Sequence, residues 1–223
     1  MAKLGYLLIL FTLLSFTSCL DDSDDEPLMF LDLGILNHYG TSEYMIITDD
    51  GIVLLTENLP RQIDFDDNAR VSLRYHVLRS APENDSIKAD YWVDVDAITE
   101  LITKEIVVVN DSTIDSLGTA PVEFQKVWIT QDFLTVYFTF YGGSKVHDFN
   151  LTYNEDGQGE DEFTYLTFQH QDNKDEQVKQ YWAYVTFRLN SLRKEGQSEI
   201  KIHFRGKQNN EDDYIQSDLV YRY

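Results

Sequence analysis

Apolar and polar residues alternate with a period of two along most of the chain beyond its N-terminal segment. This is the pattern of half-buried β-strands. In the segment 133–141, Leu134 and Val136 fall on one side, and Thr135 and Tyr137 fall on the other. The alternation recurs in the segments 70–79, 91–95, 148–153, 166–168, 185–189 and 200–205. No convincing amphipathic helix interrupts the C-terminal segments, so the pattern predicts an all-β protein.

The N-terminal half has the pattern of a small closed barrel. Gly34 interrupts its first apolar run, which indicates a bend or bulge, and Asp49-Asp50-Gly51 is a strong hairpin signal. The segment 97–104 is ambiguous, because its apolar residues have helical spacing while its β-branched residues favour a strand. Five short strands, one of them bent at a glycine, predict an OB-like β-barrel over residues 28–112.

The segment 110–120 is polar and rich in turn-forming residues, and we place the domain boundary there, between residues 112 and 113. Beyond it the alternating segments have the length and spacing of sandwich strands. The sequence therefore predicts a C-terminal β-sandwich of about seven antiparallel strands over residues 113–223.

The first 26 residues have the order of an export signal. Lys3 precedes an apolar run from Leu4 to Phe16, which is shorter than the roughly 20 residues of a membrane span. Small residues then lead to Cys19. The pattern predicts a lipoprotein signal peptide over 1–18, lipidation of Cys19 by chains such as palmitate, and an acidic tether over 19–27. The alternative is a plain secreted protein, because Phe16 replaces the leucine usual at that position.

Composition narrows the range of partners. The chain has 39 acidic and 18 basic residues, for a net charge of −21, and such a surface repels phosphate. We therefore expect no nucleic-acid partner, and a membrane partner only through the lipid anchor. Cys19 is the single cysteine, which excludes an internal disulfide, a thiolate nucleophile in the folded domains and a cysteine metal site.

No motif predicts catalysis or a cofactor. The five histidines, at 38, 76, 147, 170 and 203, are far apart in the sequence, and we expect those at 76, 147 and 203 to be solvated on polar strand faces. Gly142-Gly143-Ser144 lacks the flanking glycines and helix of a nucleophile elbow and is interpreted as a hairpin turn. A glycosidase pair stays open, because two carboxylates at any spacing are uninformative among 39 acids. We expect a non-enzymatic protein.

One acidic loop is a candidate calcium site. Residues 154–162 contain Asp156, Glu160 and Asp161 together with glycines that can bend the loop. The spacing does not match an EF-hand, and a solvated turn is the favoured alternative.

Aromatic residues also occur at positions that the alternation assigns to polar faces: Phe133, Tyr137, Tyr141, Trp182 and Tyr184. Exposed aromatic rows bind sugar rings or protein partners. The same residues can form the layer where the two domains, or the two sheets, pack together, and this is the interpretation we favour.

Several short motifs, in this order, resemble the NigD-like lipoproteins of gut and oral Bacteroidetes. They are the lipoprotein signal with its acidic flank, Gly34-Ile35-Leu36, Asp49-Asp50-Gly51, the segment 70–75, Ile102-Thr103-Lys104, Trp128, Phe149-Asn150-Leu151 and Phe168-Gln169-His170. The resemblance implies an OB domain followed by a β-sandwich. It also implies an immunity-like role, since the founding member was named for a gene beside a bacteriocin. No activity or site residue is established for the family.

Two further features follow from the resemblance. The acidic run 20–26 resembles the signal that exports such lipoproteins to the outer face of the outer membrane, which implies a surface-exposed outer-membrane lipoprotein. A plain solvated tether is the alternative. Asp85-Ser86-Ile87 and Asp115-Ser116-Leu117 resemble O-glycosylation sites of these bacteria, which implies Ser86 and Ser116 as acceptors.

The leading hypothesis is a binding module for a protein or peptide at the cell envelope, as the immunity-like resemblance implies. A glycan-binding accessory lipoprotein that uses the exposed aromatics is the second hypothesis. A structural envelope component without a soluble ligand is the third.

Overall fold

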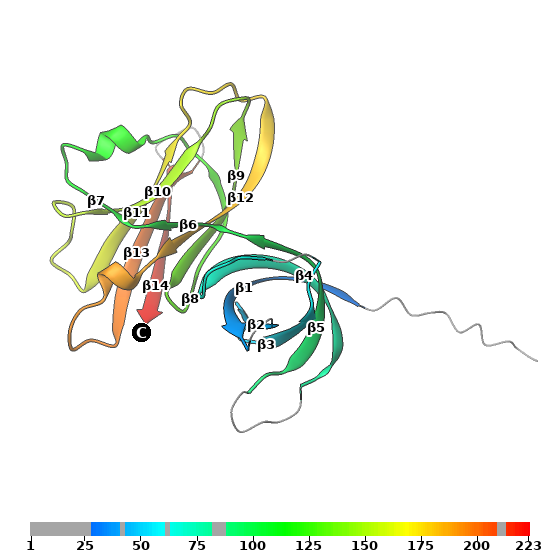
Figure 1. Cartoon of the computed structure of the whole chain (residues 1–223). Helices are drawn as coiled ribbons and strands as arrows, with labels where there is room; N and C mark the ends of the chain where they lie inside the picture. The colour runs from blue at the N-terminus through cyan, green and yellow to red at the C-terminus, as the bar shows by residue number, and fades with distance from the viewer. Residues whose placement is uncertain (1–27, 41–42, 61–62, 82–87, 209–212) are drawn as a thin grey trace, which may run out of the picture.

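The computed structural model describes residues 28–40, 43–60, 63–81, 88–208 and 213–223. They form two β-modules, a barrel and a sandwich, connected where β5 (Tyr91–Glu100) runs on into β6 (Ile102–Glu105) (Figure 1). The predicted signal peptide 1–18, Cys19 and the tether 19–27 lie outside the described residues.

The barrel confirms the OB-like prediction. Its strands are β1 (Met29–Tyr39), β2 (Glu43–Thr48), β3 (Val53–Asn58), β4 (Ala69–Ser80) and β5. They close in the order β1-β2-β3-β5-β4. The barrel is filled by aliphatic side chains with at most 3% exposure, among them Leu36, Ile46, Leu54, Val71, Leu73 and Val93.

Gly34 allows β1 to pair closely with both neighbouring strands, β2 and β4. This glycine pairs with Thr48 of β2 on one side and with Val71 of β4 on the other. A Cβ at this position would lie 2.7 Å from Ile46 Cγ2 and 2.9 Å from the carbonyl oxygen of Ile47. Only glycine lets the backbone of β2 approach this closely, which explains the interruption of the apolar run.

The sandwich consists of a five-stranded sheet, β14-β13-β11-β10-β7, and a four-stranded sheet, β6-β12-β9-β8. The further bounds are β7 (Val107–Val109), β8 (Glu123–Thr130), β9 (Phe133–Gly142), β10 (Asp148–Asn154), β11 (Phe163–Gln171), β12 (Lys179–Arg188), β13 (Glu199–Gln208) and β14 (Asp213–Arg222). The predicted sandwich is confirmed, but it has more strands than the seven expected from the sequence. Its sheets are mixed, because β7 with β10, β6 with β12, and β11 with β13 pair in parallel.

The predicted domain boundary between residues 112 and 113 needs correction. β6 and β7 belong to the sandwich, where they pair with β12 and β10, so the barrel ends at about Leu101. Short apolar strands of the two domains have the same alternation, and their partners come more than 40 residues later in the sequence. Periodicity alone therefore could not assign them. The polar segment 110–120 instead lies within the sandwich and contains a 3-10 helix, Ile114–Leu117.

Candidate functional site

The two domains meet around a buried arginine. The side chain of Arg70 is 0% exposed and lies on the outer face of β4, turned away from the barrel core. Its Nη1 and Nη2 atoms donate to Asp49 Oδ1 and Oδ2 at 2.6 and 2.9 Å, and Nη2 also donates to Thr135 Oγ1 of β9 at 3.1 Å. Trp128 Nε1 of β8 donates to Asp49 Oδ2 at 2.8 Å. The bidentate, charge-assisted pair lies within the barrel, and each of its partners forms one hydrogen bond to the sandwich, Arg70 to Thr135 and Asp49 to Trp128.

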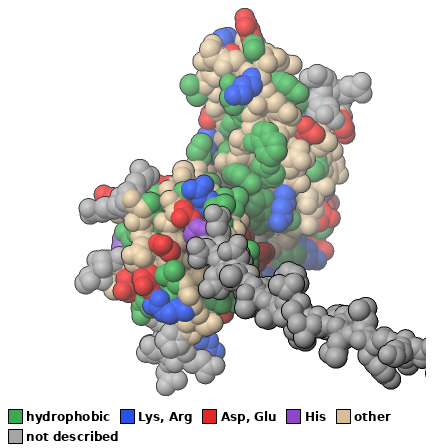
Figure 2. All heavy atoms as spheres, turned by 90° about the vertical axis from the view of Figure 1, so that its right-hand side faces the viewer, with side chains coloured by type: hydrophobic (Ala, Val, Ile, Leu, Met, Phe, Trp, Pro, Cys, Tyr) green, Lys and Arg blue, Asp and Glu red, His purple; other side chains and the backbone are tan. Residues whose placement is uncertain are grey.

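Three aromatic residues, Tyr137 of β9 and Trp182 and Tyr184 of β12, form what we call the aromatic face. They lie on the side of the four-stranded sheet that faces away from the sandwich core. The rings of Tyr137 and Tyr184 are stacked, with centroids 4.5 Å apart, and the ring centroid of Trp182 lies 6.1 Å from that of Tyr137. The side chain of Trp182 is 72% exposed. Figure 2 shows hydrophobic side chains gathered in the middle of the sandwich surface that adjoins the barrel.

A groove of about 230 Å³, called the junction groove below, separates the barrel from the aromatic face. β1, β4 and the turn after β2 form one wall, and β8, β9 and β12 form the other. The lining residues are Leu31, Asp32, Leu33, Asp49, Asp50 and Ser72 from the barrel, and Lys126, Trp128, Tyr137 and Tyr184 from the sandwich. The groove therefore combines apolar side chains with three carboxylates at its barrel side and one cation, Lys126, held over the Trp128 ring at its sandwich side. The excess of carboxylates suits a ligand that is partly apolar and partly cationic.

Burial, and secondarily the neighbouring Tyr137, raise the pKa of the Tyr184 hydroxyl. At neutral pH this hydroxyl is protonated and can donate a hydrogen bond at the edge of the groove. Asp32, in the opposite wall, accepts a hydrogen bond of 2.8 Å from the Tyr75 hydroxyl. Burial and this carboxylate hold the pKa of Tyr75 well above its usual value.

The predicted aromatic row divides into two parts. Phe133 is buried, and the guanidinium groups of Arg70 and Arg188 lie 5.8 and 5.1 Å from its ring centroid, so here the packing interpretation is correct. Trp182 and Tyr141 are 72% and 54% exposed, so for them the packing interpretation is wrong.

The three carboxylates of the candidate calcium loop between β10 and β11 do not converge on one point. Asp161 accepts from the Tyr165 hydroxyl at 2.6 Å and from the backbone N–H of Phe163 at 3.0 Å. Asp156 accepts from the backbone N–H of Asp111 at 3.2 Å, and Glu160 is exposed. Among the described residues, no three His, Cys, Asp or Glu side chains are close enough to hold a metal. The carboxylates stabilise the turn rather than converging.

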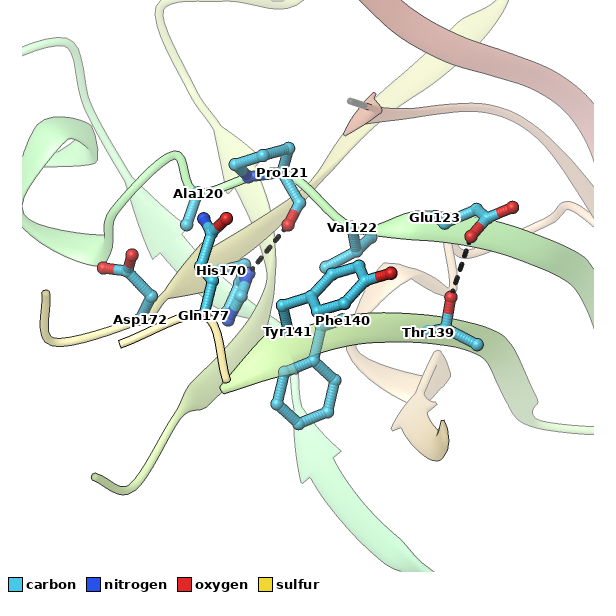
Figure 3. A pocket seen from close by; sticks show the side chains of 10 residues that line it. All are labelled: Ala120, Pro121, Val122, Glu123, Thr139, Phe140, Tyr141, His170, Asp172 and Gln177. Carbon is cyan, nitrogen blue, oxygen red and sulfur yellow. Dashed lines mark hydrogen bonds between the residues drawn. The ribbon is translucent and has the colours of Figure 1, made fainter. Parts of the chain in front are cut away.

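The expectation that His147 is solvated is wrong, because its side chain is only 4% exposed. Its Nδ1 lies 2.8 Å from Nε2 of His170, and its Nε2 lies 3.2 Å from Asp175 Oδ2. His170 Nδ1 lies 3.3 Å from the carbonyl oxygen of Pro121, at the edge of a small pocket (Figure 3). A carbonyl can only accept, so His170 Nδ1 donates to it and Nε2 is left to accept from His147. We call these residues the histidine chain.

The electrostatics of the histidine chain favour a structural role. Burial, and then the neighbouring His147, lower the pKa of His170 to about 4. The backbone N–H of Gly143 donates to Asp175 at 2.5 Å and holds the pKa of this carboxyl well below its usual range, with His147 contributing. In the described part of the chain, no hydroxyl group hydrogen-bonds to either imidazole, so the array lacks a nucleophile. It connects the turn after β9 to the loop before β12.

The sequence did not reveal the histidine chain, because its two histidines are 23 residues apart.

Of the two predicted glycosylation sites, Ser116 is exposed and its Oγ donates to the carbonyl oxygen of Thr113 at 2.7 Å. Ser86 lies outside the described residues.

None of the helices in the part of the chain that the structure describes has the length and hydropathy needed to span a bilayer.

Residues 105–218 match the model of the NigD-like C-terminal beta sandwich domain. The chain belongs to the NigD-like family. The match begins within β6, in agreement with the corrected boundary, and it confirms the family resemblance. A comparison with curated proteins finds no match to this NigD-like chain.

Solved structures show the same two-domain fold. A protein of Parabacteroides distasonis, provisionally described as toxin-related, has 22% identity and a TM-score of 0.69 over 87% of this chain and 94% of its own. A NigD-like immunity protein of Bacteroides caccae has 16% identity and a TM-score of 0.62, with coverage of 86% and 93%. A provisionally assigned lipoprotein of Bacteroides fragilis has 11% identity and a TM-score of 0.57, with coverage of 88% and 98%. At these identities the similarity shows the fold alone.

Proposed function

We propose that this NigD-like protein is a non-enzymatic envelope lipoprotein that binds a protein or peptide through its aromatic face and junction groove. The observation that carries the proposal is the exposure of Trp182, 72%, beside the stacked pair Tyr137 and Tyr184. Exposed Trp and Tyr side chains contribute much of the binding energy at protein interfaces. Beside them, the groove offers polar groups at both walls.

The ring geometry favours a protein ligand over a glycan. Sugar rings stack on free aromatic faces, whereas Tyr137 and Tyr184 lie at an interplanar angle of 12° and each covers one face of the other. What they present to a ligand is largely ring edge and hydroxyl, which suits hydrogen bonding to a polypeptide. The buried titratable groups of the histidine chain, His147, His170 and Asp175, hydrogen-bond to one another, which supports a structural and not a catalytic role for them.

A glycan-binding accessory role is the second candidate, on the strength of the polar residues beside Trp182. Gln180 Nε2 donates to Thr139 Oγ1 at 3.1 Å, and Thr139 donates to Glu123 Oε2 at 3.1 Å. Such a network next to one free indole ring could hold sugar hydroxyls. This surface offers only a single position, the Trp182 ring, on which a sugar ring could stack, so we rank glycan binding second.

The immunity-like version of the proposal is supported by the related protein described as a NigD-like immunity protein. In that version the ligand is a toxin made by neighbouring bacteria, and the protein captures it at the outer surface of the outer membrane. The related protein assigned as a lipoprotein supports anchoring through Cys19.

The binding proposal is tested with peptides selected from a random display library on the purified protein. Replacing Trp182 or Tyr184 by alanine is expected to weaken binding of the selected peptides about tenfold or more, because truncating a central interface aromatic costs about 2 kcal/mol. Tyr91→Ala, at an exposed tyrosine of β5 in the barrel, is the matched control and should leave binding unchanged. Selected peptides that bind the three variants equally would contradict the proposal, and glycan-array hits without peptide binding would favour the second candidate.

Anchoring is tested separately. Cells of a lipoprotein-processing Gram-negative host are grown with radiolabelled palmitate, and the protein is expected to carry label and to sediment with the outer membrane. Cys19→Ala should abolish the label, since Cys19 is the single cysteine of the chain. An unlabelled wild-type protein, or recovery of the wild-type protein from the cytosol, would refute the anchor.

A further inference from the structure

We propose that the free edge of β1 and the junction groove bind an extended, lysine- or arginine-bearing polypeptide segment as an added strand. This inference rests on the proposed function and specifies its ligand. It depends on the juxtaposition of an unpaired strand edge, an aromatic wall and a group of carboxylates.

The free edge results from the two-sided pairing of β1. This strand pairs with β4 over Met29–Leu36, but with β2 only from Gly34 onward. On the β2 side, Met29–Leu33 therefore has no paired strand among the described residues. The backbone N–H of Asp49 donates to the carbonyl oxygen of Leu33 at 2.9 Å, so this edge is directed toward the turn after β2. Because backbone groups repeat their direction every second residue, those of Leu31 point the same way.

The side chains around this edge suit an added strand. Leu31 is 73% exposed and lines the junction groove, and Tyr137 and Tyr184 form the opposite wall. A strand laid along β1 would form main-chain hydrogen bonds with Leu31 and place alternate side chains against the tyrosines. This is the mode of peptide recognition by strand addition, in which the backbone gives affinity and the side-chain positions give specificity.

The charge of the groove distinguishes among the molecules that could bind there. The groove is lined by three carboxylates, Asp32, Asp49 and Asp50, and by one cation, Lys126, whose ammonium lies 4.8 Å from the centroid of the Trp128 ring. Arg70 already pairs with Asp49, so the exposed Asp50 is the main partner for a lysine or arginine of the ligand, in a chain with a net charge of −21. Such a cation can also stack on the tyrosine rings. The chain's own segment 20–26 and a second copy of the protein are acidic and would be repelled. A membrane surface cannot follow a recessed groove, so a cationic peptide is the best fit.

The experiment uses fluorescence anisotropy with three eight-residue probes. The first alternates lysine or arginine with valine and threonine, the second replaces each cationic residue by glutamine, and the third is the first with alternate backbone nitrogens methylated. The cationic probe is expected to bind at least tenfold more tightly than either of the others. Its affinity should also fall steeply between 50 and 300 mM salt. Equal binding of the methylated or the neutral probe would overturn the proposal.

Protein variants locate the site. Leu31→Pro removes the edge N–H but leaves the bonds to β4, and it should weaken the cationic probe at least tenfold. Asp50→Asn keeps the shape of the groove and should weaken the probe about threefold, whereas Glu195→Gln, an exposed acid elsewhere, should not. Far-ultraviolet circular dichroism checks folding, and if Leu31→Pro fails to fold, the methylated probe and Asp50→Asn decide alone.

The two proposals fail in different ways. If library-selected peptides lose affinity in Trp182→Ala while Asp50→Asn and backbone methylation have no effect on the cationic probe, strand addition is wrong and the proposed function stands. If no peptide binds the aromatic face at all, both are wrong. Sedimentation of the purified protein with phosphatidylethanolamine vesicles, lost in Leu31→Pro, would assign this edge to a membrane and overturn the inference.

Discussion

Replacing Arg70 by methionine is expected to lower the free energy of unfolding of the barrel by about 3 kcal/mol, the lower end of the cost of breaking a buried ion pair. The guanidinium is wholly buried, whereas Asp49 retains 16% exposure, so the remaining carboxylate is only partly desolvated. Methionine fills much of the space but removes the charged donor of Asp49 and Thr135, so that Asp49 keeps only the hydrogen bond from Trp128. In urea the midpoint should fall by about 1 M or more, given the usual slopes for small domains.

The three tryptophans allow the two domains to be followed separately in this experiment. Trp92 lies in the barrel, Trp128 at the domain junction and Trp182 on the sandwich. Single-tryptophan versions of the protein should show the barrel and junction transitions shifted and the sandwich transition changed least. Arg74→Met, at an exposed arginine of the same strand, is the control and should be nearly neutral. An Arg70→Met protein as stable as Arg74→Met would show that the buried ion pair stabilises neither the barrel nor its junction with the sandwich.

The junction also determines whether the proposed binding surface exists as one unit. The junction groove has one wall in each domain, and Asp49 both accepts from Arg70 and lines the groove. Loss of this pair should therefore weaken ligand binding even though Arg70 does not line the groove. Stability and recognition depend on the same few hydrogen bonds.

The alternation of side chains was sufficient to predict the two β-modules, because it reports which residues face a core. It could not assign the segment 102–109, since a strand shows its burial pattern but not its partner. The partner of β6 follows 83 residues later, in the pair Val185–Ile102, and the partner of β7 follows 45 residues later, in the pair Thr152–Val107. Parallel pairing between distant segments leaves no local signal.

The candidate site could likewise be predicted only in part from the sequence. Residues 49, 70 and 128 were present in the motifs that indicated the family, yet nothing in the sequence placed the three side chains together. Exposed aromatics were recognised as either a binding row or a packing layer, and only the position of the barrel decides between them. It covers Phe133 and leaves Trp182 exposed. In the acidic loop, Asp156 and Asp161 accept hydrogen bonds from backbone N–H groups, as acidic residues in turns commonly do, and the sequence pattern alone does not distinguish such turns from cation-binding loops.

Acidification from pH 7 to pH 4.5 is expected to destabilise the protein by about 2–3 kcal/mol through His170 alone. Its pKa of about 4 in the folded state lies below the ordinary value of 6.5, so the unfolded chain binds more protons in this range. Stability is therefore fully present above pH 6.5 and falls as the pH drops toward 4, at about 1.4 kcal/mol per unit of pKa difference. The cause is the desolvation of the His170 imidazolium, which lies beside His147 and packs against Phe140 and Phe149.

The measurement is urea unfolding at several pH values in wild type and in His170→Gln, which retains an amide donor for the Pro121 carbonyl but cannot titrate. The variant should be less stable at pH 7, and the stability difference should shrink toward pH 4.5 because only the wild type loses the His170 contribution. His38→Gln, at an exposed histidine of the barrel, should follow the wild-type pH profile. The carboxylate of Asp172 partly offsets the effect of burial on the pKa of His170. Asp172→Asn should therefore lower this pKa further and make the loss of stability on acidification larger. Parallel pH profiles for wild type and His170→Gln would mean that the ring is protonated at no cost, and that the histidine chain does not hold the turn after β9 to the loop before β12.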